Sequence, residues 1–378
     1  MKIGLVLEKF DPQMGGLEHW TWQFAQQLLA RGHETHVISF EANPAAAQSG
    51  LVLHRLEMPR SRLDRAGVLE RHLRTLALDI IHDMGCGWYA DIFHPHGGST
   101  VALWEHNLMR IPRWRQIRFW RERRYREMTE IERRQLAVAG ATIVSVSKMV
   151  QNHFETLHGV PEERLRLIYN GVDLEEFSPA HRETHRAAAR QDLGIKDEVL
   201  YVMLAHNLLL KNATALLQAA ARLIQAGHPI RVLIAGGKRP KPFIQLAEKL
   251  GIAGQVIFRD ALEDPRPYYA AADVFVHPTW YDPCSLVVLE AWACALPVIT
   301  TRYNGASELM TDGKDGLILA KSDDVSGLAV LMTKLLDAQL RQQLGIAARE
   351  LALENSFEQQ TTRFLELYEE VRQHKQRG

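Results

Sequence analysis

Cysteine is scarce in this sequence of 378 residues, with Cys86, Cys284 and Cys294 as its three copies. An odd number without metal-ligand spacing argues against a disulfide framework and favours reduced thiols in the cytosol. Long apolar runs are lacking as well: no segment approaches about 18 uninterrupted apolar residues, so we expect no membrane-spanning helix. The apolar run at the N-terminus is too short for a secretory leader and is typical of a buried first strand.

An excess of charge of either sign is also absent, because 45 Lys and Arg balance 45 Asp and Glu. Attraction to an anionic partner therefore has to come from local patches. Short-period repeats and low-complexity tracts are missing too. A chain of this length has room for two α/β domains of roughly 150 to 200 residues each.

Short apolar runs alternate with helical patterns along the chain, which predicts parallel sheets with crossover helices. Strands are expected at residues 3–7, 35–39, 80–82, 141–146, 165–169, 199–204, 230–235, 256–258, 274–277 and 298–300. Residues 175–198 are polar and indicate a boundary. We therefore expect an α/β fold of two Rossmann-like, doubly wound domains at 1–173 and 174–355. A closing helix at 356–378 is expected to pack back toward the first domain.

Gly15 and Gly16 follow the first predicted strand and precede a helix. They allow a tight backbone next to helix N-terminal amides, which favour a phosphate. A plain strand-to-helix turn explains the same glycines. The pattern is not the dinucleotide fingerprint G-x-G-x-x-G, because the glycines are adjacent and no third follows, which argues against a nicotinamide enzyme.

Two acidic residues frame a predicted helix start in residues 277–298, with Asp282 in the loop and Glu290 a little over one turn into the helix. The amides of Ser285, Leu286 and Val287 can hold a diphosphate, and the carboxylates can accept hydrogen bonds from sugar hydroxyls. The alternative is a capping Asp282 and a solvated Glu290. However, Glu290 stands in an apolar run where an unpaired charge is costly.

The two acids have seven residues between them and are followed by Ala291-Trp-Ala-Cys-Ala-Leu-Pro-Val298, which resembles the signature of retaining glycosyltransferases of family 4. The resemblance covers almost the whole chain. It includes Gly15-Gly16, Val144-Ser-Val-Ser147, Ile168-Tyr-Asn-Gly-Val-Asp173, Phe177-Ser-Pro179, Asn304-Gly-Ala-Ser-Glu308 and Asp312-Gly-Lys-Asp-Gly316. It implies the GT-B fold, in which two Rossmann-like domains face a central cleft.

The resemblance also implies a nucleotide-sugar donor, a UDP-sugar, as co-substrate, with no separate cofactor. Glu290 is then expected to hold the donor ribose, Asp282 to contact hydroxyls of the transferred sugar, and Gly15 and Gly16 to approach the diphosphate. Asp282 is a departure, because the family usually has Glu there. The shorter side chain reaches about one methylene less far, so we expect its sugar contacts to be shifted or bridged by water.

Three further side chains take roles from the same resemblance. Lys211 matches a lysine that neutralises the leaving diphosphate, and His206 stands near the place of the usual arginine. His96 matches a histidine beside the transferred sugar. Lys211 as a solvated loop lysine and His96 as an ordinary loop histidine remain the alternatives.

A metal-free reaction with retention of configuration is implied by the family. The rival interpretation is a metal held by His94 and His96, but these histidines are two apart and no third ligand is obvious in sequence. A DxD-type metal motif is absent as well. Catalysis then relies on positioning and on stabilisation of the departing diphosphate.

Residues 110–126 contain eight arginines against one acid, interleaved with aromatic residues. Such a segment suits an anionic membrane surface, while a solvated, salt-bridged helix is the alternative. Nucleic acid is not expected, since no reader motif is present. The membrane or acceptor candidates are Arg113, Trp114, Arg118, Phe119, Trp120 and Arg121.

These features predict a hexosyltransferase acting on a glycan or glycolipid at the inner face of the cytoplasmic membrane. The chain looks most similar to bacterial enzymes of lipopolysaccharide core synthesis. Another envelope or exopolysaccharide acceptor, a GT-B-shaped epimerase and an inactive nucleotide-sugar-binding protein are the alternatives.

Overall fold

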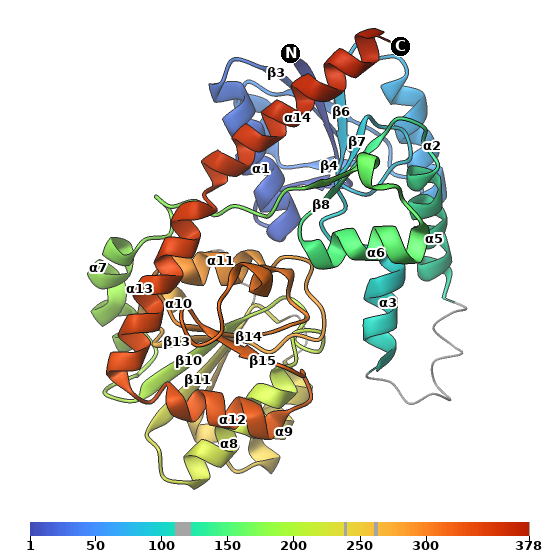
Figure 1. The fold of residues 1–378 in the computed structure, drawn as a ribbon. Helices are drawn as coiled ribbons and strands as arrows, with labels where there is room; N and C mark the ends of the chain where they lie inside the picture. The colour runs from blue at the N-terminus through green and yellow to red at the C-terminus, as the bar shows by residue number, and fades with distance from the viewer. Residues whose placement is uncertain (110–121, 238–239, 261–263, 378) are drawn as a thin grey trace. The chain divides into compact units, whose positions relative to one another are not determined.

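The computed structural model describes residues 1–109, 122–237, 240–260 and 264–377. It divides into an N-terminal unit, made of Met1–Tyr169 with Glu358–Gly378, and a C-terminal unit, Asn170–Phe357. Each unit contains one parallel sheet covered by helices (Figure 1). The predicted α/β class with two Rossmann-like domains is confirmed.

The sheet of the N-terminal unit has the strand order β5-β3-β1-β6-β7-β8-β9, and every pair is parallel. The strands are β1 (Lys2–Val6), β3 (Glu34–Ser39), β5 (Val52–Arg55), β6 (Ile80–Asp83), β7 (Ile92–Phe93), β8 (Thr142–Ser145) and β9 (Leu165–Leu167). The short strands β2 (Lys9–Phe10) and β4 (Glu41–Ala42) form a separate parallel pair. The central strands are buried on both faces, as crossover helices require.

The helices of the N-terminal unit follow the ends of these strands. They are α1 (Gly16–Ala30), α2 (Arg62–Leu73), α3 (Thr100–Met109), α5 (Arg123–Leu136), α6 (Lys148–His158) and the C-terminal α14 (Phe357–Arg377), with 3-10 turns η1 (Pro44–Gln48) and η2 (Glu162–Arg164). Ser147 caps α6 by accepting from the Val150 amide, as the sequence predicts.

The C-terminal helix packs on the first sheet's helices although it follows the C-terminal unit in sequence (Figure 1). Phe364 and Tyr368 of α14 are buried against Phe24 of α1. The Tyr368 hydroxyl lies 2.6 Å from Nδ1 of His82 on β6, and Gln360 accepts a hydrogen bond from the Trp20 indole. Tertiary packing thus places the last helix in the N-terminal unit.

The sheet of the C-terminal unit has the order β12-β11-β10-β13-β14-β15, again all parallel. The strands are β10 (Val199–Leu204), β11 (Ile230–Ala235), β12 (Val256–Arg259), β13 (Val274–His277), β14 (Val298–Thr301) and β15 (Leu317–Leu319). The helices are α7 (Pro179–Asp192), α8 (Ala213–Gln225), α9 (Lys241–Lys249), α10 (Arg266–Ala271), α11 (Leu286–Ala293), α12 (Val325–Lys334) and α13 (Ala338–Glu354), with η3 (Ala253–Gln255) and η4 (Gly305–Leu309). Strands β10 and β13 are neighbours in the sheet but are not consecutive in the chain, so the strand order reverses beside β10.

The division between the units falls at Tyr169/Asn170 and Phe357/Glu358, not at the predicted 173/174 and 355/356. The reason is a backbone crossing: the Val172 amide donates to the Asn355 carbonyl, and the Phe357 amide donates to the Val172 carbonyl. A side chain on Gly171 would collide with the Ser356 carbonyl, at 2.6 Å. The two crossing segments are therefore held together inside the C-terminal unit.

The polar stretch that indicated a boundary is largely helix α7. Its arginines fasten it to the rest of the unit: Arg186 and Arg190 pair with the buried carboxylate of Asp273 and donate to carbonyls at the end of α10. Positive side chains at a helix C-terminus satisfy its open carbonyls and its dipole. The polar composition of this stretch is thus explained by the arginines that attach α7 to the rest of the C-terminal unit.

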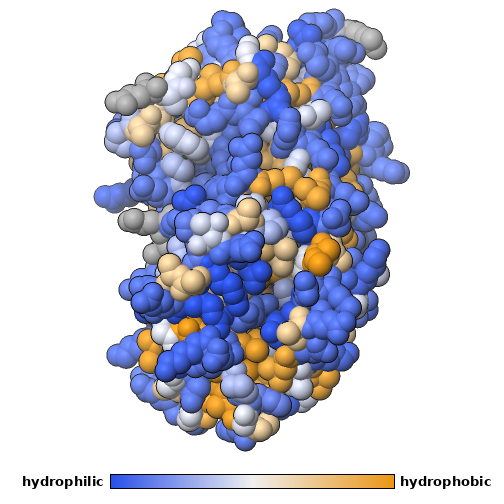
Figure 2. Space-filling view, turned by 90° about the vertical axis from the view of Figure 1, so that its left-hand side faces the viewer, coloured by the Kyte–Doolittle hydropathy of each residue, from blue (hydrophilic) through white to orange (hydrophobic). Residues whose placement is uncertain are grey.

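Among the described residues no helix is long and apolar enough to cross a membrane. On the face shown in Figure 2, hydrophobic residues form small patches separated by hydrophilic ones.

Candidate functional site

Lys211 and Asp282 form the charged centre of the C-terminal unit's candidate site. Lys211 lies just before α8, and its Nζ is 2.6 Å from Oδ2 of Asp282. The same oxygen lies 2.9 Å from Nε2 of His277, the last residue of β13. Two backbone hydrogen bonds fix Asp282, to the Tyr303 carbonyl and from the Gly305 amide. The sequence separates Lys211 from Asp282 by a long stretch of chain, and the sheet brings them together.

The electrostatics of this cluster are set by burial and by the ion pair. Burial alone would raise the pKa of Asp282, but the Lys211 ammonium and the His277 ring hold it well below its usual range. Burial lowers the pKa of His277, with Asp282 opposing that shift. His277 is therefore neutral near pH 7 and donates from Nε2 to the carboxylate. Asp282 lies in the loop between β13 and α11, as the sequence predicts, and it is a buried, ionised acceptor.

Helix α11 begins at Leu286, so its first amides lie at the end of the loop that follows β13. Ser285 precedes it, but its amide already donates to Oδ1 of Asn304, at 3.2 Å. The predicted anion-binding amides therefore reduce to Leu286 and Val287, the first two of the helix, which lack intrahelical partners by geometry. Asn304 begins the motif Asn304-Gly-Ala-Ser-Glu308, but only the structure shows that its side chain holds the start of α11.

Glu290 lies on α11 and is half-buried among apolar neighbours, where an unpaired charge would be costly. It has a hydrogen-bond partner. Its Oε2 accepts a hydrogen bond of 2.6 Å from the Tyr269 hydroxyl, which also lies 3.1 Å from the Val287 carbonyl. Burial, and then the Glu290 charge, raise the pKa of Tyr269 well above its usual value. Tyr269 thus remains a donor at every ordinary pH. Sequence alone offered no signal for this pair, since the partners lie on different helices.

His206 follows β10 and is exposed, in the same loop that leads to Lys211. The loop is anchored to the Asp282 segment, because the Trp280 amide donates to the Leu210 carbonyl at 3.0 Å. Lys211, Asp282, Ser285 and the start of α11 are therefore assembled at one edge of the sheet, the carboxyl ends of β10 and β13. Ligands of open α/β sheets bind at that edge, where the strand order reverses.

Gly15, Gly16 and His96 belong to the N-terminal unit. Gly15 has an extended backbone (φ −177°) and caps α1, which begins at Gly16. His96 packs its ring 4.6 Å from that of Trp20 and 4.0 Å from that of His94. Burial lowers the pKa of His96 to about 3, so it is neutral at pH 7.

The histidines around His96 form a packed group with aromatic neighbours. His82 and His94 stack at 5.3 Å, and both are fully buried. Burial is the largest cause that lowers the pKa of His82, to about 3, and that of His94. Within the described residues no group of three or more His, Cys, Asp or Glu side chains is arranged to hold a metal ion.

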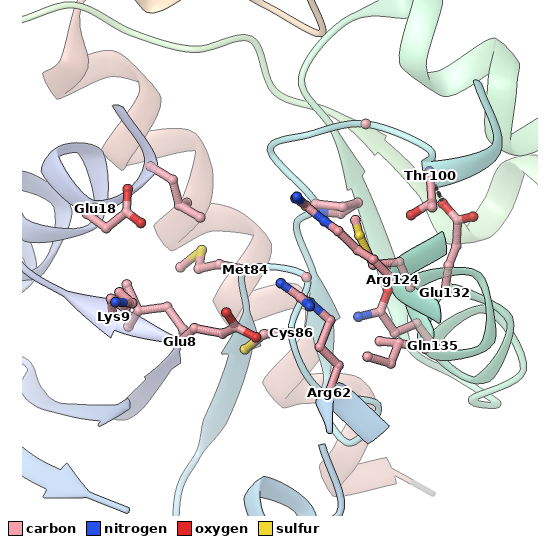
Figure 3. Close-up of a pocket in the computed structure, with 17 residues that line it drawn as sticks. Glu8, Lys9, Glu18, Arg62, Met84, Cys86, Thr100, Arg124, Glu132 and Gln135 are labelled. Atoms are coloured by element: carbon pink, nitrogen blue, oxygen red, sulfur yellow. Dashed lines mark hydrogen bonds between the residues drawn. The ribbon is translucent and has the colours of Figure 1, made fainter. Parts of the chain in front are cut away.

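A cavity of about 250 Å³ opens beside this region of the N-terminal unit (Figure 3). It lies at the carboxyl ends of β1 and β6 and is closed by α1, α2 and α5. Charged side chains from several elements line it: Glu8, Lys9, Glu18, Arg62, Arg124 and Glu132. They come from four segments with no common motif, and of the six only Arg124 belongs to a feature that the sequence analysis singled out, the arginine-rich residues 110–126.

Asp83, at the end of β6, holds the turn from which Met84, Gly85 and Cys86 line the cavity. Its buried carboxylate accepts from the amides of Gly85, Cys86 and Gly87 at 2.6 to 2.8 Å. Burial raises the pKa of Asp83 to about 6, while these amides oppose the rise. A side chain on Gly87 would lie 2.7 Å from the carboxylate, so this turn requires glycine.

The membrane or acceptor candidates Arg113, Trp114, Arg118, Phe119, Trp120 and Arg121 lie outside the described residues. The helix that follows, α5, does carry arginines. Several are paired within the helix, such as Arg123 with Glu127 and Arg133 with Glu130.

Comparison with protein families matches two models that together cover most of the chain. Residues 14–176 match "Glycosyltransferase Family 4", and residues 185–351 match "Glycosyl transferases group 1". Their boundary agrees with the division of the structure into two units.

Several similar proteins are named as glycosyltransferases. A D-inositol 3-phosphate glycosyltransferase of Thermomonospora curvata is 28% identical over 94% of this chain and 90% of its own length. One from Corynebacterium urealyticum is 36% identical over 54% of this chain and 51% of its own length. The chain thus spans about half the length of several of the relatives that it matches.

Solved structures of similar architecture include WaaG, described as a glycosyltransferase involved in lipopolysaccharide biosynthesis. The TM-score is 0.82 at 21% identity, over 97% of this chain and 99% of that one. HepE of Anabaena in complex with UDP-glucose gives a TM-score of 0.74 at 19% identity, covering 97% and 99% of the two chains. These likenesses establish the two-domain fold that the sequence predicts.

Proposed function

Because the chain joins a glycosyltransferase family 4 domain to a group 1 glycosyl transferase domain in the GT-B fold, we propose that it transfers a hexose from a UDP-sugar to a hydroxyl of a glycan or glycolipid. The observation that carries the proposal is the cluster at the carboxyl edge of the second sheet. Lys211, Asp282 and Glu290 there surround the amides that begin α11.

The parts of this cluster match the parts of a nucleotide-sugar. The Leu286 and Val287 amides, with the helix dipole and the Lys211 ammonium, suit a diphosphate. Glu290 suits ribose hydroxyls, and Asp282 suits hydroxyls of the sugar through the charge that Lys211 and His277 hold in place. A UDP-hexose is also the ligand of the similarly folded HepE.

The reaction we propose needs no metal and retains the anomeric configuration. Charge that develops on the departing diphosphate is stabilised by groups already fixed in the fold, which is the largest kind of contribution such a site can make. His96 is neutral in its packed environment, so it can donate or accept one hydrogen bond without carrying charge.

A donor panel tests the proposal directly. We expect the purified protein, treated with EDTA, to transfer sugar from one of UDP-glucose, UDP-galactose, UDP-N-acetylglucosamine or GDP-mannose to lipopolysaccharide core or to D-inositol 3-phosphate. Mass spectrometry detects the product, and proton NMR reports its anomeric configuration. Binding of donors without transfer indicates a binding protein, and sugar isomerisation of the free donor indicates an epimerase.

Lipopolysaccharide core and polyol phosphates are the two acceptor classes that the panel compares. The description of WaaG suggests lipopolysaccharide core, and the name of the D-inositol 3-phosphate glycosyltransferases suggests a polyol phosphate.

Peripheral attachment to the inner face of the cytoplasmic membrane is the remaining part of the proposal. The basic and aromatic residues of 110–126 motivate it. Replacing Trp114, Phe119 and Trp120 together by serine is expected to lower binding to anionic liposomes by roughly tenfold, since aromatic side chains supply the buried area. Flotation assays measure it, and UDP binding is the control. Unchanged flotation would rule out the membrane role of these residues.

A further inference from the structure

Three histidines of the N-terminal unit form a line at one edge of its sheet, and the donor site uses none of them. His36 lies on β3, His54 on the edge strand β5, and His72 in the last turn of α2. Nδ1 of His36 is 2.9 Å from Nε2 of His54, and Nδ1 of His54 is 3.1 Å from Nε2 of His72. At the other end, Nε2 of His36 is 3.0 Å from Oε1 of Glu34. We call this continuous series of contacts, from Glu34 to His72, the histidine chain.

The spacing within the histidine chain is that of hydrogen bonds. The rings of His36 and His54 are 15° from parallel with centroids 5.2 Å apart, and their facing nitrogens are 2.9 Å apart, so the rings meet end to end. A tetrahedral zinc ion, with bonds of about 2.0 Å, needs two ligand nitrogens about 3.3 Å apart, and a linear ion needs more. Each gap between rings therefore fits a proton better than a metal ion.

The number of protons that the histidine chain can hold follows from its three contacts. Each contact needs one proton, and three neutral rings carry three. Because ionised Glu34 can only accept, His36 donates to it from Nε2, and His54 and His72 then donate from Nε2 in turn. One extra proton is accommodated, since a charged ring donates at both nitrogens and the next rings reverse their tautomers. A second extra proton makes two N–H groups face each other in one gap and places two positive rings in contact.

The carboxylate of Glu34 balances charge at the β3 end of the histidine chain. Among the described residues, Glu34 is the one carboxylate within ion-pair distance of these rings, and Lys2 of β1 pairs with it at 3.3 Å. The hydrogen bond from His36, and then that from Lys2, lowers the pKa of Glu34, so it stays ionised. Asp79, in the loop after α2, accepts from the Lys2 amide at 2.7 Å. Glu34 can thus balance one positive ring but not two.

The middle of the histidine chain lies further from compensating charge. Burial, and then the charges of His36 and His72, lower the pKa of His54. At this end of α2, Glu70 and Arg74 pair with each other at 2.8 Å. A second extra proton therefore adds positive charge where burial already disfavours it.

The elements that the histidine chain connects lie at the margin of the N-terminal sheet. Strand β5 has four residues and stands at the end of the strand order, next to β3. An edge strand has a sheet neighbour on one side only, so side-chain contacts contribute more to holding it. We propose that the histidine chain is an acid-sensitive clasp. It fastens β5 and the last turn of α2 to β3 while it holds at most one extra proton, and it opens when a second one enters.

The pH range of opening follows from the difference between folded and unfolded histidines. An unfolded histidine titrates near pH 6.5, at about its reference value. Because the pKa of His54 is lowered in the folded protein, the unfolded chain binds more protons below that pH. The contribution of the clasp to stability is therefore fully present above about pH 6.5 and is lost as the pH falls through the folded pKa.

NMR of the histidine rings tests the hydrogen-bond order. We expect nitrogen-detected spectra of the whole protein at pH 8 to show the proton of His36, His54 and His72 on Nε2. On acidification the three rings should titrate together in two steps at least one pH unit apart, because the second proton meets the charge of the first. Mixed tautomers at pH 8, or three independent single steps, would overturn the proposal.

Hydrogen–deuterium exchange tests the opening. After correction for the intrinsic effect of pH on exchange, we expect the amides of β5 and of the last turn of α2 to exchange at least tenfold faster at pH 5 than at pH 7.5. The amides of β10, in the C-terminal unit, should change by much less. Equal corrected exchange of β5 at the two pH values is incompatible with an acid-sensitive clasp.

Two variants separate the clasp from general acid destabilisation. His54→Phe keeps a ring on β5 but removes both gaps, so β5 should exchange fast at pH 7.5 already and gain little more at pH 5. His72→Gln keeps a hydrogen-bond partner for His54 and removes one titrating ring. Its opening should therefore shift to lower pH, because the two extra protons must then lie on adjacent rings. UDP binding shows that each variant is folded.

The matched control is His374→Gln, which changes an exposed histidine of α14 in the same unit. It should leave the pH dependence of β5 exchange as in the unchanged protein. If His54→Phe shows the same acid acceleration of β5 exchange as His374→Gln, the histidine chain is not the clasp.

Discussion

Glu290→Ala is expected to lower kcat/KM for the nucleotide-sugar by roughly 100-fold, with weaker donor binding and an intact fold. Hydrogen bonds to a charged group contribute about 1.5 to 3 kcal/mol each, and a carboxylate on a ribose makes up to two. The substitution leaves a helix-favouring residue on α11 and removes one hydrogen bond, from Tyr269. Steady-state kinetics and UDP calorimetry measure the change. Full activity of this variant is incompatible with the assigned donor site.

Tyr269→Phe is the matched control for Glu290. It removes the hydroxyl that donates to Glu290 and to the Val287 carbonyl but keeps the buried ring and the carboxylate. We expect a loss of activity of less than tenfold, because Glu290 keeps its charge and position on the helix. A loss as large as that of Glu290→Ala means that orientation by Tyr269, more than the carboxylate itself, determines donor binding.

Lys211→Ala is expected to reduce kcat by roughly 100-fold or more, because the departing diphosphate loses the one lysine placed at the start of α8. The same change leaves the Asp282 carboxylate buried without its cation. Breaking one side of a buried pair costs about 3 to 5 kcal/mol, so thermal unfolding should shift downward as well. Rapid-quench turnover and calorimetric unfolding measure the two effects separately.

A double-mutant cycle with Asp282→Asn separates these two roles of Lys211. If the lysine acts on the diphosphate, Lys211→Ala lowers kcat in the Asp282→Asn background as much as in the unchanged protein. If it only neutralises Asp282, the double variant recovers both stability and turnover. The first outcome supports the catalytic assignment, and the second removes Lys211 from it.

Asp282 illustrates how the structure changes a role that sequence similarity suggests. The spacing from Glu290 places both acids near one helix start, and the structure agrees with that placement. However, Asp282 is 8% exposed and shares one oxygen between Lys211 and His277. Its effect on a sugar therefore depends on this cluster, which includes His277, a residue that had no role assigned from sequence patterns.

Local patterns predicted what depends on near neighbours in the chain. The short apolar runs of the buried strands, the Ser147 cap of α6 and the apolar start of α11 all follow from local propensity, and they sufficed for two Rossmann-like domains. The polar residues 175–198 lie close to the division between the units, but most of them form α7, which is held by Arg186 and Arg190 on Asp273. That docking depends on a carboxylate more than eighty residues away.

By itself, then, the sequence determined the parallel α/β class, the glycine turn before α1 and the pair of acids around α11. Only the tertiary structure decided which side chains meet: Lys211 with Asp282, and Glu290 with Tyr269. The physical reason is that a parallel sheet gathers the carboxyl ends of strands distant in sequence at one edge. Side-chain charge, burial and pKa at that edge are set by residues with no local pattern to reveal them.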